Sequence, residues 1–407
     1  MGRPDPPVGG TEGRERTGPL EGCLVVEFAD YVTGPFAAVL LAALGARVVK
    51  LERPPHGDPF RGWGEGGYSP TFCALNHSKE SIGLDLQDSR GRAVAVELCE
   101  RADVFIENHR PGVAAGLGLG WDALSRLNPR LVYCAISGFG PHGPYSDRPG
   151  YDTIGQAMAG LLGLLTDRSA PTGMGMSLSD HLTGLFAAFG VVAALTQRER
   201  TGRGEHVETS LLRSTVAFVA ENAARYFATG DVPTRTDRTR LAQVYAFVAG
   251  DGLPFVIHLS SPQKFFAGLA TAVGLPALAD DPRFADRRAR IDNYEQLEAI
   301  LAPLFRERPR ADWLDRLAGE DVPAAPINDL GEVFGDPQVR ELDLVRELTH
   351  PVHGSVRVVE GALRFGSAAT PSLSAPPTLG EHTDSILAEV GMSADGIRSL
   401  RAAGVVL

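Results

Sequence analysis

The sequence predicts an α/β fold built on a mostly parallel sheet with helices on both faces. The main observation is that short apolar runs typical of strands alternate with segments of helical length between residues 24 and 137. The length of 407 residues exceeds what one hydrophobic core usually serves, so two domains are expected. A composition that is 43% hydrophobic and 22% charged indicates a globular chain.

The first elements form a βαβ unit. A strand is expected at residues 24–28, a helix from Gly34 and Pro35 to about Leu44, and a second strand at 46–51. Proline suits the first helical turn because its missing N–H needs no partner there, and Gly45 suits the helix end. Further strands are expected at 81–86, 103–107 and 131–137, with helices at 89–101 and 121–127 between them.

The pattern turns helical after Tyr151. Helices are expected at 153–165 and 180–200, followed by a glycine-containing break at 201–204 and a strand at 206–209. Short strands return beyond Pro337, and the chain ends in a helix-rich segment from Gly380. Between these parts, residues 221–337 shift in composition to a small α+β region with a strand at 255–259 and helices at 262–273, 294–305 and 310–317.

Charge and cysteine usage narrow the function classes. A net charge of −11 argues against nucleic-acid binding, which needs a basic face. An acidic chain that handles anionic substrates must gather Arg, Lys and backbone N–H groups at its site. The four cysteines form no CxxC pair, and Cys23 and Cys134 lie in apolar runs, which favours buried thiols in a reducing compartment.

No targeting or membrane segment is expected. Residues 1–19 are rich in Gly, Pro and charge and have no apolar leader stretch, so they predict a disordered tail. The most apolar helical stretch, about 182–196, is shorter than the roughly 20 residues that span a bilayer. We therefore expect a cytoplasmic protein that does not enter a membrane.

Three strand ends carry residues suited to a ligand. The loop from Asp30 to Pro35 precedes a helix, whose N-terminal N–H groups attract phosphate or carboxylate. Arg53 ends the second strand and could pair with a phosphate. Asn108 and Arg110 follow the strand at 103–107, where a tight turn could present them to a ligand. A plain strand–helix connection, a solvated strand end and a surface turn explain the same residues, and the spacing alone does not separate these alternatives.

Asp180 precedes a strongly apolar helix and has two interpretations. Ser179 or Asp180 is a good helix N-cap, which by itself explains an acid at this point. A carboxylate at a helix N-terminus is also expected to stay ionised at neutral pH and can act as a nucleophile. Other chemistries are disfavoured, because the ten histidines include no HExxH and the chain has neither a GxSxG elbow nor a Walker phosphate loop.

Taken together, several segments resemble the class III CoA-transferase family, which includes formyl-CoA transferases, carnitine CoA-transferases and α-methylacyl-CoA racemases. The resemblance covers the chain from about Leu20 to Leu407, and it is specific because the segments occur in the family's order. They are Gly34-Pro35 with LGARVVKLERP, ENHRPG, SGFGPHGPYSDRPGYD, SDHLTGLFAAFG with RTGRGEHVETSLL, DPRF, VPAAPIND, DPQV, HPVHG and APPTLGEHT.

The resemblance implies an architecture and a reaction. The fold is expected to be a Rossmann-like large domain at residues 20–220, completed by 338–407, with a small domain at 221–337, in an interlocked homodimer. The expected reaction moves coenzyme A from an acyl-CoA thioester to a small free carboxylic acid, with no permanently bound cofactor and no metal. By position in the family's motifs, Asp180 is the nucleophile that becomes acylated. The expected CoA contacts are Tyr31, Val32, Arg53, Leu84, Gln87, Asn108, Arg110, Tyr151 and Asp152.

Departures from the family pattern bear on the activity. Tyr151 stands where the family's racemases carry a histidine, and a phenol is a poor base near neutrality, which favours transfer over racemisation. Residues 237–241 read DRTRL where formyl-CoA transferases carry a glycine-rich flap, and Gly116 replaces an arginine of some members. The alternatives are an acyl-CoA racemase or epimerase and a non-catalytic CoA-binding protein. A nicotinamide dehydrogenase is disfavoured by the missing glycine fingerprint.

Overall fold

The computed structural model describes residues 18–63, 68–260, 262–366 and 371–407. The chain forms two compact units. The first runs to Leu162 and continues through Gly173–Glu221 and Leu344–Leu407, and the second comprises Gly163–Thr172 and Asn222–Asp343. The second unit thus includes a short segment near residue 165 that the sequence analysis assigns to the large domain. Of the expected tail at 1–19, only Gly18 and Pro19 lie within the described residues.

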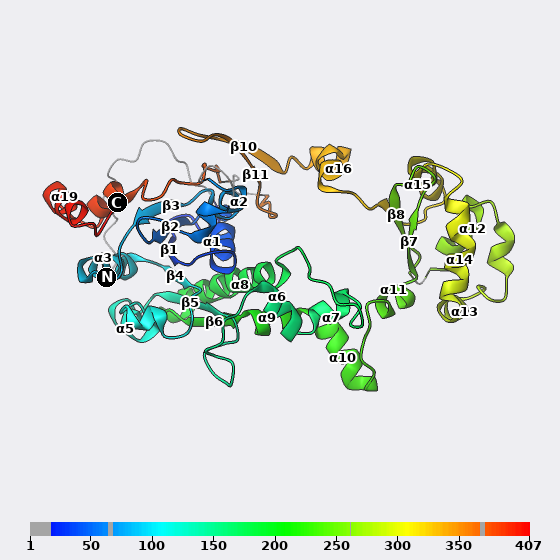
Figure 1. Cartoon of the computed structure of the whole chain (residues 1–407), viewed down its shortest axis with the longest axis horizontal. Coiled ribbons are helices and arrows are strands. Elements are labelled where there is room, and N and C mark those ends of the chain that lie inside the picture. The colour runs from blue at the N-terminus through cyan, green and yellow to red at the C-terminus, as the bar shows by residue number, and fades with distance from the viewer. Residues whose placement is uncertain (1–17, 64–67, 261, 367–370) are drawn as a thin grey trace. The chain divides into compact units, whose positions relative to one another are not determined.

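Six parallel strands form the sheet of the first unit (Figure 1). Their order is β3-β2-β1-β4-β5-β6, so the strand order reverses between β1 and β4. The predicted parallel sheet is therefore confirmed, with small shifts at the strand ends. The bounds are β1 Leu24–Phe28, β2 Arg47–Glu52, β3 Glu80–Gly83, β4 Val104–Glu107, β5 Val132–Ser137 and β6 His206–Ser210.

Alternating side chains along the strands build an apolar layer on each face of the sheet. Val25 and Val48 pack on one face with helices α1 and α8. Val26 and Val49 pack on the other face with α3, α5, α18 and α19, so helices cover both faces as predicted. The bounds are α1 Thr33–Ala43, α3 Ser89–Arg101, α5 Trp121–Leu127, α8 Leu178–Thr201, α18 Thr383–Glu389 and α19 Ala394–Ala402.

The single helix expected at 153–165 is wrong, because the structure has two helices there. These are α6 (Asp152–Met158) and α7 (Leu161–Leu165). Gly160 between them has a φ of 81°, in the left-handed region that a right-handed helix cannot contain. The break leaves α6 as a separate short helix that packs against α8.

Helix α8 is longer than the apolar stretch considered in the sequence. It has 24 residues and is long and apolar enough to cross a membrane, so the argument that it is too short to do so is wrong. Ala187 and Val191 on one face are buried in the core beside α1. Leu185 and Phe189 on the other face are 53% and 71% exposed. The helix therefore has one apolar face in the core of its unit and one that is largely exposed among the residues that the structure describes.

The second unit is built on a three-stranded antiparallel sheet in the order β7-β8-β9. Phe247, Phe255, Phe305 and Trp313 belong to its buried core. The strand and three helices expected in this region are present, and β7 and β9 are additional. The bounds are β7 Val244–Val248, β8 Pro254–His258, β9 Ala324–Pro326, α12 Gln263–Ala272, η2 Pro276–Asp280, α13 Arg287–Asp292, α14 Tyr294–Phe305, α15 Arg310–Gly319, α16 Leu330–Gly335 and α17 Pro337–Glu341.

The remaining elements are short helices and one further pair of strands. The short strands expected after Pro337 are present as an antiparallel pair, β10 and β11. The polar run before Gln243 contains a short helix, α11, which the sequence analysis did not predict. The bounds are η1 Pro59–Gly62, α2 Pro70–Asn76, α4 Val113–Gly116, α9 Leu211–Phe218, α10 Ala220–Thr229, α11 Asp237–Ala242, β10 Val345–His350 and β11 Gly354–Val359.

Four buried charged side chains form what we call the buried ion cluster: Glu27, Lys50, Asp58 and Lys79. The Lys50 Nζ lies 2.8 Å from a Glu27 oxygen and 3.0 Å from an Asp58 oxygen, and Lys79 lies 2.7 Å from the other Glu27 oxygen. All four side chains are 0% exposed. Burial by itself lowers the pKa of Lys50, but Glu27 and Asp58 outweigh it and hold the pKa above its usual value.

We expect Lys50→Met to lower the free energy of unfolding of the first unit by about 3–5 kcal/mol, because Glu27 and Asp58 lose a buried counter-ion. Urea unfolding measures this change. The matched control is Lys264→Met, which removes an exposed pair with Asp321 and should change stability by less than about 0.5 kcal/mol. Equal effects of the two substitutions would show that the cluster contributes little.

Candidate active site

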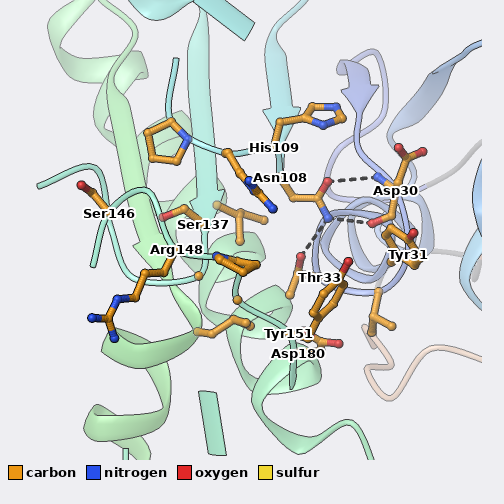
Figure 2. A pocket seen from close by; sticks show the side chains of 18 residues that line it. Asp30, Tyr31, Thr33, Asn108, His109, Ser137, Ser146, Arg148, Tyr151 and Asp180 are labelled. Carbon is orange, nitrogen blue, oxygen red and sulfur yellow. Dashed lines mark hydrogen bonds between the residues drawn. The ribbon is translucent and has the colours of Figure 1, made fainter. Parts of the chain in front are cut away.

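The site lies where the strand order reverses. In open parallel sheets, ligands bind beyond the carboxyl ends of the strands at this point, which here falls between β1 and β4. Asn108, after β4, joins the two loops that leave these strands (Figure 2). Its Nδ2 donates to the Asp30 carbonyl at 2.7 Å and to Thr33 Oγ1 at 3.0 Å, and its Oδ1 accepts the Asp30 N–H at 3.0 Å. One amide side chain therefore holds both loops together.

Two cavities open beside these loops. We call them the Asp180 cavity, with a volume of about 230 Å³, and the Arg53 cavity, with a volume of about 670 Å³. Asp30 and His109 line both, so the two cavities adjoin. The structure thus gathers all of the predicted site residues except Asp152. Those in the Asp180 cavity are Tyr31, Val32, Asn108, Arg110, Tyr151 and Asp180, and those in the Arg53 cavity are Arg53, Leu84 and Gln87.

Asp152 lies beside the Asp180 cavity and is not among its lining residues. Its Oδ1 accepts the backbone N–H of Asp180 at 3.1 Å, and its Oδ2 accepts from Gln156 Nε2 at 2.5 Å. Both carboxylate oxygens are therefore engaged by N–H groups of the protein itself. A direct contact between Asp152 and coenzyme A stays a prediction, whereas its contact with Asp180 is present in the structure.

Asp180 is the third residue of α8 and does not cap the helix. The N-cap position is Ser177, which makes no side-chain capping bond, so the assignment of Ser179 or Asp180 as N-cap is wrong. A helix start leaves several N–H groups unpaired. Asp152, from the neighbouring α6, accepts the one that belongs to Asp180. The Asp180 carboxylate consequently lines the cavity rather than serving its own helix.

Burial raises the pKa of Asp180 to about 7, and the negative charge of Asp152 adds to the effect. The positive end of the α8 dipole favours the ionised form, but these two influences outweigh it. The expectation that Asp180 stays fully ionised at neutral pH is therefore wrong. With this pKa, about half of the carboxyl groups are protonated near pH 7.

Close helix contacts position the start of α8. A Cβ atom on Gly184 would lie 2.7 Å from the carbonyl oxygen of Thr33, and one on Gly155 would lie 2.4 Å from Ser179 Oγ. Both distances are shorter than van der Waals contact, so only glycine allows α1 and α6 to approach α8 this closely. These contacts bring Asp180 near the loops that follow β1 and β5.

Two tyrosines form part of the wall of the Asp180 cavity. The Tyr31 and Tyr151 rings meet edge to face with centroids 6.3 Å apart. Tyr31 has a φ of 67°, which costs a non-glycine residue on the order of 1–3 kcal/mol. Its N–H makes a long hydrogen bond, 3.4 Å, to Asp58 of the buried ion cluster, which supports this conformation. Tyr151 is 64% exposed, so its ring is open to a ligand.

Sequence reasoning named Asp30 only as the start of a ligand loop, and it missed four other lining residues of the Asp180 cavity: His109, Ser137, Ser146 and Arg148. All lie within or beside the motifs that it selected, but a motif does not show which of its side chains face a cavity. Burial raises the pKa of Asp30 to about 6 and lowers that of His109 to about 4. His109 is thus a neutral imidazole at neutral pH, and Figure 2 shows its ring directed away from Asp180.

The fold and the site together define a class of protein. It is a doubly wound α/β protein with a cavity at the switch point, whose lining includes two arginines and two carboxyl groups with a raised pKa, Asp30 and Asp180. Such shifted groups concentrate at functional sites. Across the described ranges, no group of three or more His, Cys, Asp or Glu side chains is placed to hold a metal ion.

Comparisons with known proteins identify the family. The model of CoA-transferase family III matches residues 20–383, and the chain belongs to this family. The resemblance drawn from the motifs, and the expectation of an enzyme of this family, are confirmed.

Individual relatives extend over most of the chain. It is 37% identical over 395 residues to the succinyl-CoA:glutarate CoA-transferase of Mus musculus, covering 95% of this chain and 90% of that one. It is 40% identical over 327 residues to the acetyl-CoA:oxalate CoA-transferase of Acetobacter aceti, covering 79% and 84%. A solved structure of a CAIB/BAIF family protein from Brucella suis matches with a TM-score of 0.81 and 35% identity, over 92% of this chain and 100% of that one.

Proposed function

We propose that this enzyme moves coenzyme A from an acyl-CoA thioester to a free carboxylic acid through a covalent intermediate on Asp180. The observation that carries the proposal is the place of Asp180, a carboxyl with a raised pKa that lines a cavity at the switch point of the sheet. At neutral pH a substantial fraction is ionised and nucleophilic. Coenzyme A occupies both adjoining cavities in this proposal, contacting the eight residues assigned by the family motifs that line them.

The reaction begins when the Asp180 carboxylate attacks the acyl carbonyl carbon of the donor. The C–S bond breaks, CoA leaves as a thiolate, and a mixed anhydride remains on Asp180. The thiolate then attacks the Asp180 carbonyl, which releases the first acid as a carboxylate and leaves an aspartyl–CoA thioester. The acceptor carboxylate attacks this thioester, and the same steps in reverse yield the new acyl-CoA. The N–H of Asp180 donates to Asp152 and is not available to stabilise the oxyanions.

If Asp180 is the nucleophile, replacing it should abolish most of the transfer activity. Asp180→Ala should lower kcat by more than about 10⁴-fold, the scale on which removal of a nucleophile acts. Mass spectrometry of wild-type enzyme mixed with succinyl-CoA should show a covalent adduct on Asp180 that hydroxylamine removes. Binding of free CoA, measured by calorimetry, serves as the control and should persist in Asp180→Ala. Full transfer activity in this variant would contradict the covalent mechanism.

We propose dicarboxylic acids as the acceptor class. Two relatives are named for transfer to the dicarboxylic acids glutarate and oxalate. Arg110 and Arg148 line the Asp180 cavity and offer guanidinium groups to a second carboxylate. A retained charged hydrogen bond of this kind contributes about 1.5–3 kcal/mol.

An acceptor screen tests this class. With acetyl-CoA as donor, kcat/KM for glutarate, succinate or oxalate should exceed that for butyrate by about tenfold or more. Mass spectrometry of the acyl-CoA products gives the rates. Equal rates for monocarboxylic and dicarboxylic acids of matched length would contradict the proposed class while leaving the covalent mechanism intact.

We also propose that the enzyme is an interlocked homodimer, as the family resemblance implies. The outward face of α8 carries Leu185 and Phe189, and the neighbouring α9 carries Val216 and Phe218, each of them 47% exposed or more. A patch of this kind marks a surface for another protein. Light scattering should therefore give a mass of two 43.3 kDa chains. Phe189→Glu should shift the mass towards a single chain, and a wild-type monomer would contradict the proposal.

A further inference from the structure

We propose that Asp152 is a positioning residue that holds Asp180 in place and, by its charge, favours acylation of Asp180 over the free carboxylate. This inference rests on the proposed function, because it concerns the same covalent step. Two donors fix the carboxylate of Asp152, close contacts hold α6 and α8 at a constant separation, and acylation removes the charge of Asp180.

The carboxylate of Asp152 is fixed by two donors. Its Oδ1 accepts the N–H of Asp180, and its Oδ2 accepts from Gln156 Nε2. Gln156 is 0% exposed, and its Nε2 also donates to the carbonyl of Met176 at 3.0 Å, in the segment that leads into α8. A buried amide therefore holds both Asp152 and the chain just before the helix. Asp152 cannot rotate away from Asp180 without breaking these bonds.

The separation of α6 and α8 is also fixed. Gly155 of α6 lies directly against Ser179, where any larger side chain would collide with Oγ. Ser179 Oγ in turn lies 2.7 Å from Thr215 Oγ1 of α9, and both residues are 0% exposed. Close-packed interiors of this kind do not deform continuously. The backbones that carry Asp152 and Asp180 are therefore held at a constant separation.

Other titratable and charged groups surround Asp180, but Asp152 is the charge that acts on its pKa. Helix α1 has no titratable side chain, α9 carries Arg213, and the His181 ring on α8 lies against Phe36. The remaining groups around the Asp180 cavity are Asp30, Tyr31, His109, Arg110, Arg148 and Tyr151.

Acylation removes the negative charge of Asp180, which the Asp152 carboxylate repels. When the Asp180 carboxylate attacks the thioester, its oxygen forms a bond to the acyl carbon and the C–S electron pair leaves with CoA sulfur. Asp180 is then a neutral anhydride, and the negative charge is on the thiolate. The aspartyl–CoA thioester that follows is neutral at Asp180 as well. Repulsion from Asp152 thus acts on the free carboxylate and is absent from each covalent intermediate, which shifts the balance towards them.

The test uses Asp152→Asn, which keeps an oxygen to accept the Asp180 N–H and removes the charge. Acylation by succinyl-CoA without acceptor is followed by mass spectrometry across a pH series. In wild-type enzyme the rate should rise with pH and level off above the pKa of about 7. In Asp152→Asn the midpoint should fall by about one pH unit or more, and the acylated fraction at high pH should fall by about tenfold for each unit.

Two further variants complete the experiment. Asp147→Asn removes an exposed charge from the preceding loop and should leave the pH profile and the acylated fraction unchanged. Asp152→Ser is a second neutral substitution, for use if the asparagine variant does not fold. A purely structural role predicts lower activity with the midpoint still near 7, and that result would overturn the inference. If Asp180→Ala retains transfer, the proposed function itself fails, so the two failures are distinguishable.

Discussion

The buried ion cluster supports the loop on which the site depends. Lys50 donates to the carbonyl of Ala29, just before the loop, and Lys79 donates to that of Pro35 at its end. Asp58 accepts the N–H of Tyr31 in between. Charges with 0% exposure are stable only when they are paired, so Glu27, Lys50, Asp58 and Lys79 must occupy one arrangement. Because the cluster is bonded to both ends of the loop between β1 and α1, it fixes the position of this loop, which forms part of the cavity wall.

A second constraint acts at the start of α8. Gly184 brings this helix against α1, and Gly155 brings it against α6. Packing at this density leaves Asp180 half-buried beside Asp152, and water cannot fully hydrate either carboxylate. The usual effect of a helix N-terminus, a stable anion, is therefore reversed here. Burial and the charge of Asp152 destabilise the free Asp180 carboxylate. The acylated form is neutral and is not destabilised in this way, so such a carboxylate is suited to covalent catalysis.

The secondary-structure elements that the sequence predicts correctly are those that depend on local sequence pattern. The strands β1, β2, β4, β5 and β6 and the helices α3, α5 and α14 appear at or close to their expected bounds, because apolar periodicity and glycine or proline at the ends are local properties. The motif residues also gather as expected, since the carboxyl ends of parallel strands meet at one edge of the sheet. By contrast, the break at Gly160 was not predicted, because glycine occurs both within helices and between them. In the structure Gly160 has a φ of 81° and separates α6 from α7.

The amino-acid sequence by itself determined the α/β class, the order of the strands along the chain, the family and the motifs that carry Asp180, Asn108 and Arg53. Only the tertiary structure decided the contacts of these groups and their pKa values. Asp152 and Asp180 are 28 positions apart, and their hydrogen bond exists because α6 packs on α8. The pKa of Asp180 and the pairing of Lys50 with Asp58 likewise depend on burial. Burial is a property of the folded chain, because water is excluded only when elements distant in sequence come together.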